Sequence, residues 1–476
     1  MQHQPMGVDD AEIASHTSPG RARLELIVVG LGAFVVALAQ SLLIPVLGEL
    51  PADLHTSSSN VSWLLTSTLL VGAVSVPVMG RLGDMFGKRL MLLVALGALI
   101  AGSLLTAVTS NIALLIAGRA IQGASSAAIP LGISLLAGLL PKERVGSAVA
   151  LISAMLGVGS ALGLPLAGLV AEHADFHALF WITLAVGVVS FIGVLAIVPE
   201  SPSRTGGKVD ALGTVLLGAT LVCLLLPLSQ ASQWGWGSGR VWTLLAAAAV
   251  LLAVFSWSQT KIAEPLVDLA ALGRKPIILA NVASVLFGFA LFASFIGTAA
   301  YVEAPEATGY GFGSSLVVGG LAMLPSGLMM LILSPVAARL ISSRGGPQTL
   351  AIGAVIVAAG FLFRITVHAD LWQIIVGSTI IGAGTGIGYA ALPSIINAHT
   401  PAPELAAANG INSLARSLGS SLASAIGSSV LAGSVVLVGH FEMPSFDAYR
   451  ELFVMCGIAS LLAAVVAVGI PHRRAA

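Results

Sequence analysis

The stretch GRLGDMFGKR, residues 80–89, places four charged side chains between two long apolar segments. Arg81, Asp84, Lys88 and Arg89 stand within ten residues of a chain in which only 9% of all residues are charged. Three glycines separate them. The pattern indicates a short, charged connection between two apolar helices.

The composition of the whole chain is that of an integral membrane protein. Of its 476 residues, 57% are hydrophobic and 9% are charged, whereas soluble domains carry about 25% charged residues. The apolar residues come in blocks of roughly 20, the length at which a helix crosses the hydrocarbon core. The blocks do not alternate polar and apolar residues as barrel strands do. We therefore predict an all-α integral membrane fold whose partner is the lipid bilayer. The net charge of zero gives no reason to expect a nucleic-acid partner.

Fourteen apolar blocks predict fourteen transmembrane helices. If the N-terminus is cytoplasmic, sixteen of the 21 Lys and Arg residues fall on the cytoplasmic side and only Arg240, Arg364 and Arg450 fall outside. Because cytoplasmic loops are enriched in Lys and Arg, a multi-pass protein with both termini in the cytoplasm is predicted. The predicted helices span 24–48, 60–79, 90–108, 112–139, 146–170, 178–198, 211–229, 241–258, 276–302, 314–337, 349–367, 371–397, 405–437 and 449–470.

An internal repeat divides these helices into two sets. Segments that begin at residues 76, 118 and 152 resemble segments 258, 259 and 260 residues further on. Three collinear matches at nearly one offset indicate two six-helix halves with an inserted helix pair. Such halves are the architecture of a rocking transporter that binds substrate near the midplane. The predicted parts are a cytoplasmic tail (1–23), an N-terminal six-helix bundle (24–199), a linker with two extra transmembrane helices (200–260) and a C-terminal six-helix bundle (261–476).

The opening stretch resembles the loop signature of the major facilitator superfamily, G-x-L-x-D-x-x-G-R-K, with the last two residues exchanged. The matching residues are Gly80, Leu82, Asp84, Gly87, Lys88 and Arg89. More narrowly, QWGWG at 233 and EPLVDL at 264 are similar to the fourteen-helix drug:proton antiporters of the multidrug efflux type. The resemblance implies a major facilitator fold and a gating latch at this stretch. The glycines would allow close approach, and the Asp would accept hydrogen bonds from the amides of a helix N-terminus. The alternative is a solvated, positively charged loop.

The degenerate second copy of the stretch, residues 334–347, has Ser342 where Asp84 would lie. An asymmetric latch is therefore expected, with the N-terminal copy dominant.

A second motif lies in the predicted helix 112–139. Arg119, Gln122 and Gly123 match the superfamily's R-x-x-Q-G. Because an arginine inside a membrane helix is costly, it usually faces a cavity or a partner. The resemblance implies that Arg119 and Gln122 tune a proton-accepting group or touch substrate. The alternative is that Arg119, near the helix end, extends to the outer surface.

A third motif, GVGSALGLPLAGL at 157–169, resembles the antiporter signature of spaced glycines followed by Gly-Pro. The residues that match are Gly159, Gly163, Pro165 and Gly168, whereas Leu164 splits the usual Gly-Pro pair and Ala167 replaces a closing glycine. In the family this signature marks exporters rather than importers. Ordinary close packing of small residues is the alternative.

The predicted helices hold no acid or histidine at their centres. A proton-coupled pump needs a group that gains and loses a proton. Gln40 and Ser41 stand where the family's usual acid of the first helix would lie. Glu303, at the end of the ninth predicted helix, is the best candidate for the coupling residue. Its alternative role is a charge at the extracellular rim.

Arg119 and Arg416 place positive charge within the membrane. This favours a neutral or anionic amphipathic substrate over a cation. For Arg416, a cavity-lining position and an ion-pair or snorkelling role both stay open. Candidates for the substrate cavity are Gln40, Trp63, Phe292 and Asn412.

These observations predict a secondary active efflux transporter, not an enzyme. It would export small amphipathic drugs or metabolites in exchange for protons, by alternating access of the two halves. No cofactor or metal is expected, and the proton gradient is the expected energy source. The expected partners are a small-molecule substrate and protons, with the protein a monomer in a bacterial cytoplasmic membrane. The alternatives are a facilitator or importer of a neutral or anionic metabolite without proton coupling and, remotely, an integral-membrane enzyme.

Overall fold

The computed structural model describes residues 19–48, 50–201, 204, 210–262, 265–267, 269–439 and 441–471. The predicted tail up to residue 18, part of the linker, and Glu264 and Asp268 of EPLVDL lie outside the described residues.

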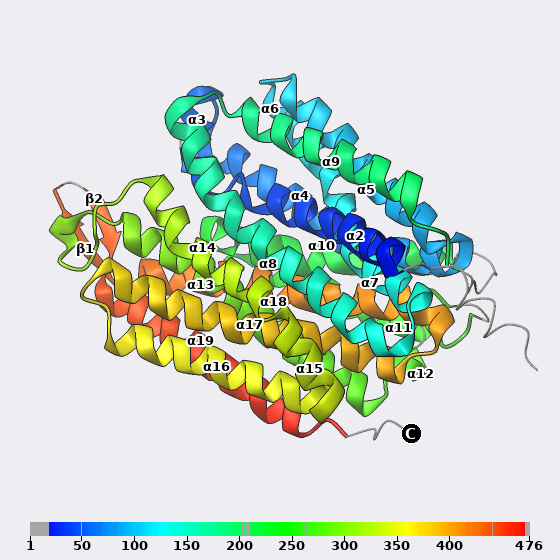
Figure 1. Cartoon of the computed structure of the whole chain (residues 1–476). Coiled ribbons are helices and arrows are strands. Elements are labelled where there is room, and N and C mark those ends of the chain that lie inside the picture. Colours follow the sequence, from blue (N-terminus) through cyan, green and yellow to red (C-terminus); the bar gives the residue numbers. More distant parts are fainter. Residues whose placement is uncertain are drawn as a thin grey trace, which may run out of the picture.

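The apolar blocks form helices, since backbone groups within a membrane must be hydrogen-bonded inside their own segment. The long helices lie side by side in one bundle (Figure 1). The elements are α2 (Pro19–Ser41), η1 (Pro45–Gly48), α3 (Leu50–Asp53), α4 (Ser58–Phe86), α5 (Lys88–Ala107), α6 (Ile112–Gly123), η2 (Ala124–Ala127), α7 (Ala128–Leu139), α8 (Lys142–His173), α9 (His177–Ile197), α10 (Ala211–Trp234), α11 (Gly239–Gln259), α12 (Leu269–Leu272), α13 (Lys275–Glu303), η3 (Glu306–Thr308), α14 (Leu316–Ile332), α15 (Ser334–Arg344), α16 (Gly346–Thr366), α17 (Leu371–His399), η4 (Ala402–Glu404), α18 (Leu405–Gly433), β1 (Val435–Val438), β2 (Phe441–Pro444) and α19 (Phe446–Val468).

Each of the fourteen predicted ranges overlaps a helix of the described chain, although the bounds of several differ. Twelve spans are long and apolar enough to cross a membrane, and α14 with α15 form a broken thirteenth. The remaining predicted range corresponds to α18, whose 29 residues are long enough to cross at 1.5 Å per residue. Its serines and its arginine make it less apolar than the others. The chain is thus an all-α, multi-pass membrane protein.

The predicted helix 314–337 is not straight. It breaks at Leu333, and α15 bends by 43° from α14. Pro335 lies in the first turn of α15, and a proline there removes a backbone donor and clashes with the carbonyl four residues earlier.

The predicted helix 405–437 ends early. It stops at Gly433, and β1 and β2 follow as an antiparallel hairpin that pairs Val435 with Pro444. β1 consists of three valines and a leucine, so its apolar composition alone did not separate it from the helix. In Figure 1 this hairpin lies at one end of the bundle, and α12 and the end of α19 lie at the other. We call the first the hairpin end and the second, where residues 80–89 lie, the latch end.

Buried apolar side chains gather in separate cores on either side of the bundle. One core comes from α13, α14, α16, α17, α18 and α19. Two neighbouring cores are built mainly from α2 and α4 to α9. Two groups of helices therefore each have an interior of their own, and the surfaces between them form a seam.

The inserted helices α10 and α11 cover part of this seam. Leu217, Leu221 and Leu225 of α10 pack in one cluster with Ala73 of α4 and Leu414 of α18. Near the hairpin end, two hydrogen bonds add to this contact. The Gln230 side chain donates to Thr66 Oγ1 of α4 at 3.0 Å, and Trp236, just after α10, donates to Ser429 Oγ of α18 at 2.7 Å. The pair thus fastens one helix of each half.

Candidate functional site: a latch and a cavity between the halves

The stretch at 80–89 is a helix junction rather than a loop. Helix α4 continues to Phe86 and α5 begins at Lys88, so Gly87 alone separates them. Gly87 has a φ of 131°, a conformation that favours glycine. A Cβ at Gly87 would come within 2.5 Å of the Glu200 carboxylate. The expectation of a charged loop is therefore wrong: Asp84 lies in the last turn of α4.

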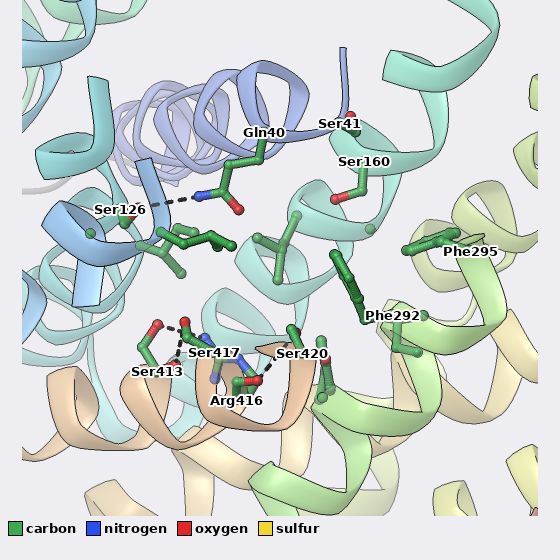
Figure 2. Close-up of a pocket in the computed structure, with 18 of the residues that line it drawn as sticks. Gln40, Ser41, Ser126, Ser160, Phe292, Phe295, Ser413, Arg416, Ser417 and Ser420 are labelled. Carbon is green, nitrogen blue, oxygen red and sulfur yellow. Dashed lines mark hydrogen bonds between the residues drawn. The ribbon is translucent and has the colours of Figure 1, made fainter. Parts of the chain in front are cut away.

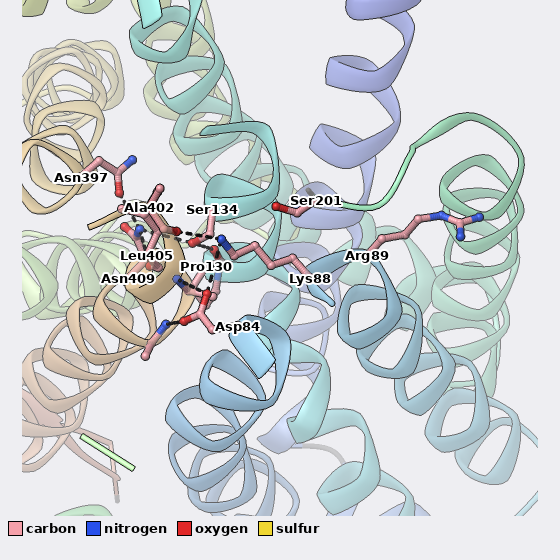
Figure 3. Close-up of polar contacts among 12 residues, drawn as sticks. Asp84, Lys88, Arg89, Pro130, Ser134, Ser201, Asn397, Ala402, Leu405 and Asn409 are labelled. Carbon is pink, nitrogen blue, oxygen red and sulfur yellow. Dashed lines mark hydrogen bonds and ion pairs between the residues drawn. The ribbon is translucent and has the colours of Figure 1, made fainter. Parts of the chain in front are cut away.

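Asp84 joins the two halves at the latch end. Its carboxylate accepts hydrogen bonds from the backbone N–H of Ala406 at 3.3 Å and of Ala407 at 2.9 Å. These amides belong to the first turn of α18, where a helix presents free N–H groups and the positive end of its dipole. Figure 3 shows Asp84 between α4 and this helix end. A carboxylate of one half thus caps a helix of the other.

Lys88 completes this contact. Its ammonium lies 3.4 Å from the Asp84 carboxylate and donates to the Ala402 carbonyl at 3.2 Å, and both ionised side chains are fully buried. Gly80 makes the approach possible, since a Cβ there would lie 2.8 Å from the Ala406 carbonyl oxygen. These contacts favour the latch interpretation over a solvated loop. We call Gly80, Asp84 and Lys88, with their α18 partners, the latch.

Arg89 and Glu200 hold the start of α5. Glu200 accepts hydrogen bonds from the backbone N–H of Arg89 at 2.9 Å and of Leu90 at 3.2 Å, which satisfies free amides of that helix N-terminus. The Arg89 side chain donates to the Leu195 carbonyl at 2.6 Å. Both contacts lie within the N-terminal half, so Arg89 orients α5 and makes no contact across the seam. The motif did not point to Glu200, which lies 111 residues away.

The second copy of the stretch forms no such contact. Ser342 of α15 is exposed, and its hydroxyl donates to the Arg339 carbonyl of its own helix at 2.9 Å. A further hydrogen bond crosses the seam close to the latch: Asn409 of α18 donates to Ser134 of α7 at 3.4 Å (Figure 3). The latch contacts of the described residues are thus asymmetric between the two copies.

Arg119 is buried inside the N-terminal half and does not extend outward. It is 2% exposed. Its guanidinium donates to the backbone carbonyls of Leu64 at 3.2 Å and Ala39 at 3.1 Å, and to Gln122 Oε1 at 2.9 Å. Gln122 in turn donates to Ser103 of α5 at 2.8 Å. Because Arg119 links α6 to α2 and α4, extension to the outer surface is wrong.

The glycines of the third motif face two different helices. Gly159 and Gly163 of α8 lie directly against α2, at Phe34 and Ser41, with no room for a Cβ. On the opposite side Gly168 faces α14, where a Cβ would lie 2.8 Å from the Val317 nitrogen. Pro165 is in backbone contact with Gly320 of α14 in the same way. The motif therefore brings α8 of one half against α14 of the other, and small residues make that contact close.

A cavity lies between the two halves at mid-depth of the bundle. It has a volume of about 160 Å³, several times what one water molecule needs. Figure 2 shows Gln40 and Ser126 on one side of it and Arg416 with its serines on the other. It is lined by Gln40, Ser41, Ile44, Thr68, Leu69, Gly72, Ala73, Ser126, Ile129, Leu156, Gly157, Ser160 and Leu164 from the N-terminal half, and by Gly288, Leu291, Phe292, Phe295, Met330, Tyr389, Ser413, Arg416, Ser417 and Ser420 from the C-terminal half.

Of the predicted site residues, Gln40, Phe292 and Arg416 line this cavity. Asn412 lies directly behind it and binds Arg416. Trp63 is not among its lining residues. The serines at 413, 417 and 420 were missed, although their three- and four-residue spacing around Arg416 on one helix could have shown that they share a face.

Arg364 was predicted to lie on the outer side, and it stands in the last turn of α16, toward the hairpin end, with its side chain buried. It belongs to α16, is 2% exposed, and its guanidinium lies 4.1 Å from the centre of the Phe453 ring. It donates to Thr298 of α13. Position at a helix edge does not reveal which way a long side chain turns.

Glu303 ends α13 near the hairpin end, away from the cavity. It is half-buried, and its carboxylate lies against Gly319 of α14 with no space for a Cβ between them. The next residue, Gly320, is the one that meets Pro165 of the other half. No Lys or Arg of the described chain forms an ion pair with Glu303. Glu303 is therefore neither an exposed rim charge nor a cavity residue.

A family comparison agrees with this arrangement of two halves around a cavity. The model of the Major Facilitator Superfamily matches residues 29–363 and 283–476. The chain belongs to the major facilitator superfamily. The protein is accordingly a membrane transporter and not an enzyme.

Its similar proteins include exporters and resistance proteins. It is 29% identical over 432 residues to the tetracenomycin C resistance and export protein of Streptomyces glaucescens, in an alignment that covers 89% of this chain and 78% of that protein. It is 27% identical to the probable actinorhodin transporter of Streptomyces coelicolor over 77% of this chain and 65% of that one. It is 26% identical to the lincomycin resistance protein LmrB of Listeria monocytogenes, over 78% of each.

Solved structures share the fold of this protein. The human organic anion transporter MFSD10 superposes with a TM-score of 0.66 at 15% identity, over 95% of this chain and 100% of that one. The proton:xylose symporter XylE superposes with a TM-score of 0.65 at 15% identity, over 96% and 97%. At this identity the likeness concerns the fold alone.

Proposed function

We propose that this protein exports small amphipathic compounds across a bacterial cytoplasmic membrane in exchange for protons. The observation that carries the proposal is the cavity that both halves line, with the latch joining them at the latch end. A substrate between two halves can be exposed to one side and then to the other when the halves rock. The names of its relatives, which are drug-resistance and export proteins, support an amphipathic cargo.

The positive residues support the orientation of this cycle. The latch end carries most of the Lys and Arg residues, which are retained on the cytoplasmic side of membrane proteins. In the present conformation the latch would then close the cytoplasmic side. Opening of the latch would admit cargo from the cytoplasm, and its closure would commit the cargo to release at the hairpin end.

Glu303 is the residue we propose for proton exchange. It is an acid set in a helix contact rather than in open water, since its carboxylate lies against Gly319 of α14. Its contact at Gly319 adjoins the contact of Gly320 with Pro165. Protonation of Glu303 can therefore alter the contact between α8 and α14, which rock against each other during transport.

The proposal is tested in everted membrane vesicles, whose lumen corresponds to the cell exterior, under an imposed pH gradient with an acidic lumen. A panel of cationic, neutral and anionic aromatic compounds is offered outside. The wild-type protein should accumulate at least one of them, and an ionophore that collapses the gradient should stop accumulation. Glu303→Gln should lose the response to the gradient, whereas Glu306→Gln, the same change at an exposed neighbour, should keep it. If no compound moves under any gradient, the proposal fails.

A further inference from the structure

The cavity has one charge, and that charge is positive. Among the described residues that line it, Arg416 is the only ionisable side chain that is charged at neutral pH. No carboxylate of the described chain forms an ion pair with it. Tyr389 and Gln40, which line the same cavity, are uncharged. The field inside the cavity therefore has the sign of a cation, and nothing on its wall neutralises it.

Arg416 is held in position by groups that leave this charge intact. Its guanidinium donates to Asn412 Oδ1 at 3.3 Å and to Ser413 Oγ at 3.1 Å. Asn412 is itself fixed, because it donates to Asn281 at 2.9 Å and to Ser284 at 2.7 Å on α13. The guanidinium carbon lies 5.5 Å from the centre of the Tyr389 ring. All of these partners are neutral.

Several donors of Arg416 remain for a ligand. A guanidinium has five N–H groups in a rigid, planar arrangement. One bond from each of two terminal nitrogens accounts for the contacts to Asn412 and Ser413. Ser417 and Ser420 lie on the same wall beside it (Figure 2). Their hydroxyls donate to the backbone carbonyls of Ser413 and Arg416 at 3.2 Å each, so the donors that remain on this wall for a group with two or more oxygens are the N–H groups of Arg416.

Another part of the cavity wall is apolar. Phe292 and Phe295 are three residues apart on α13 and line the same side (Figure 2). Leu291, Met330 and Leu164 extend this surface. Aromatic and aliphatic side chains gain from burying a ring or chain of the cargo, and they hold no polar group that would need to be satisfied. The cavity thus has a cationic, hydroxyl-rich wall and an aromatic wall.

We propose that this transporter selects amphipathic organic anions, and that Arg416 is the residue that determines this selectivity. The cargo class is an aromatic or aliphatic body that carries one anionic group with two or more oxygens, such as a carboxylate or a sulfonate. The oxygen group pairs with Arg416, since guanidinium groups bind planar or multidentate oxyanions through two parallel hydrogen bonds. The body lies against Phe292 and Phe295. A lipophilic cation is repelled from the same place, because charges interact strongly where water is scarce.

This inference rests on the proposed function, and a binding experiment separates the two. The full-length protein is purified in lipid nanodiscs, and binding is measured by titration calorimetry. The three probes share one ring system: naphthalenesulfonate, naphthalenesulfonamide and naphthylmethylammonium. The sulfonate should bind at least tenfold more tightly than the neutral sulfonamide, and the ammonium should bind most weakly. A charge-assisted hydrogen bond corresponds to a difference of about ten- to a hundredfold.

Variants then assign the preference to Arg416. Arg416→Gln should bring the sulfonate and the sulfonamide within about twofold of each other, while Arg416→Lys should keep part of the preference because it keeps the charge. Arg450→Gln removes the same charge from an exposed position on α19 and should leave the order of the probes unchanged. Phe292→Ala should weaken all three probes by a similar factor, because it removes contact with the shared ring.

Three results would overturn the inference. They are equal or tighter binding of the sulfonamide in the wild-type protein, tightest binding of the ammonium, and an unchanged sulfonate preference in Arg416→Gln. The first two need no variant, so they decide the matter even if Arg416→Gln fails to fold. Gradient-driven accumulation of only neutral or cationic compounds would overturn this inference and leave the exporter proposal standing. Sulfonate-selective binding without transport of any compound would overturn the exporter proposal and leave this inference standing.

Discussion

Replacement of Asp84 by Asn is the sharpest perturbation that the latch offers. The side chain keeps its size, and its remaining carbonyl oxygen can still accept one N–H from the first turn of α18. Its amide nitrogen, however, is a donor, and it now faces another donor, either the second backbone N–H of α18 or the Lys88 ammonium. Lys88 is left as a fully buried positive charge without its carboxylate. The damage falls on the latched conformation, since opening of the latch end exposes Lys88 to water.

The size of the effect follows from the burial of the pair. Removal of one partner of a buried ion pair costs about 3–5 kcal/mol, and loss of a carboxylate from a helix N-terminus costs about 0.3–1 kcal/mol more, partly counted already. We take about 3 kcal/mol for the difference between latched and open conformations, which changes their ratio by about 150-fold. A latched population of about 99% would then fall to roughly 40%.

Spin-label distance measurements on the purified protein would show this change. Labels on exposed Ser147 of α8 and exposed Gln348 of α16 report on the two halves at the latch end, after Cys223 and Cys456 have been replaced. Asp84→Asn should move much of the distance distribution to longer values and should reduce transport at least tenfold.

Two control variants bracket this result. Asp447→Asn makes the same chemical change at an exposed site at the hairpin end, and Ser342→Ala changes the second copy of the latch stretch. Neither should alter the latch-end distances. The reasoning is refuted if folded Asp84→Asn protein keeps the wild-type distance distribution and transport rate, or if Ser342→Ala impairs transport as much.

Three further predictions concern the surroundings of the cavity. Arg119→Gln removes hydrogen bonds to two buried backbone carbonyls, so it should lower stability by about 2–4 kcal/mol, seen as a lower melting temperature, yet leave the order of ligand affinities unchanged. Gly320→Val places a side chain into the backbone of α8 at Pro165, and at least a tenfold loss of transport is expected in protein that still elutes as a single peak. Gln230→Ala combined with Trp236→Phe removes two hydrogen bonds worth about 1 kcal/mol each. Spin-label distances at the hairpin end should then broaden while those at the latch end stay as they are.

The helices and the latch could largely be predicted from the sequence. Blocks of apolar residues at membrane-spanning length decide where helices form, because no other backbone arrangement is tolerated there. The resemblance of Gly80, Asp84 and Gly87 to the superfamily's loop signature likewise implied a latch. The partners of Asp84 could not be predicted, since Ala406 and Ala407 contribute backbone amides, which any residue has, from more than 300 positions away.

The direction of long side chains was the main limit for the site. Arg364 stood near the end of an apolar block and was assigned to the outer side, but the structure turns it into the C-terminal half against Phe453. Arg119 and Arg416 are both arginines within predicted helices, yet of these two only Arg416 lines the cavity. Tertiary packing decides this, and helix periodicity alone does not carry that information.

An anionic cargo has a consequence for the energy source. A membrane potential that is negative inside drives one negative charge outward by about 2.3 kcal/mol per 100 mV. A carboxylate in the cavity would oppose such a cargo, which agrees with the uncharged Gln40 at the place of the family's usual acid. Export of an anion in exchange for a proton would be driven by both components of the proton gradient.

The most direct test of the whole account is the proton flux that accompanies cargo movement. Everted vesicles that contain the wild-type protein and a pH-sensitive dye in their lumen are given naphthalenesulfonate, which crosses lipid poorly by itself. The account predicts that the lumen becomes more alkaline as the sulfonate accumulates, and that Glu303→Gln abolishes this proton flux. Accumulation of the sulfonate with no change in lumenal pH would contradict proton exchange and identify an uncoupled facilitator.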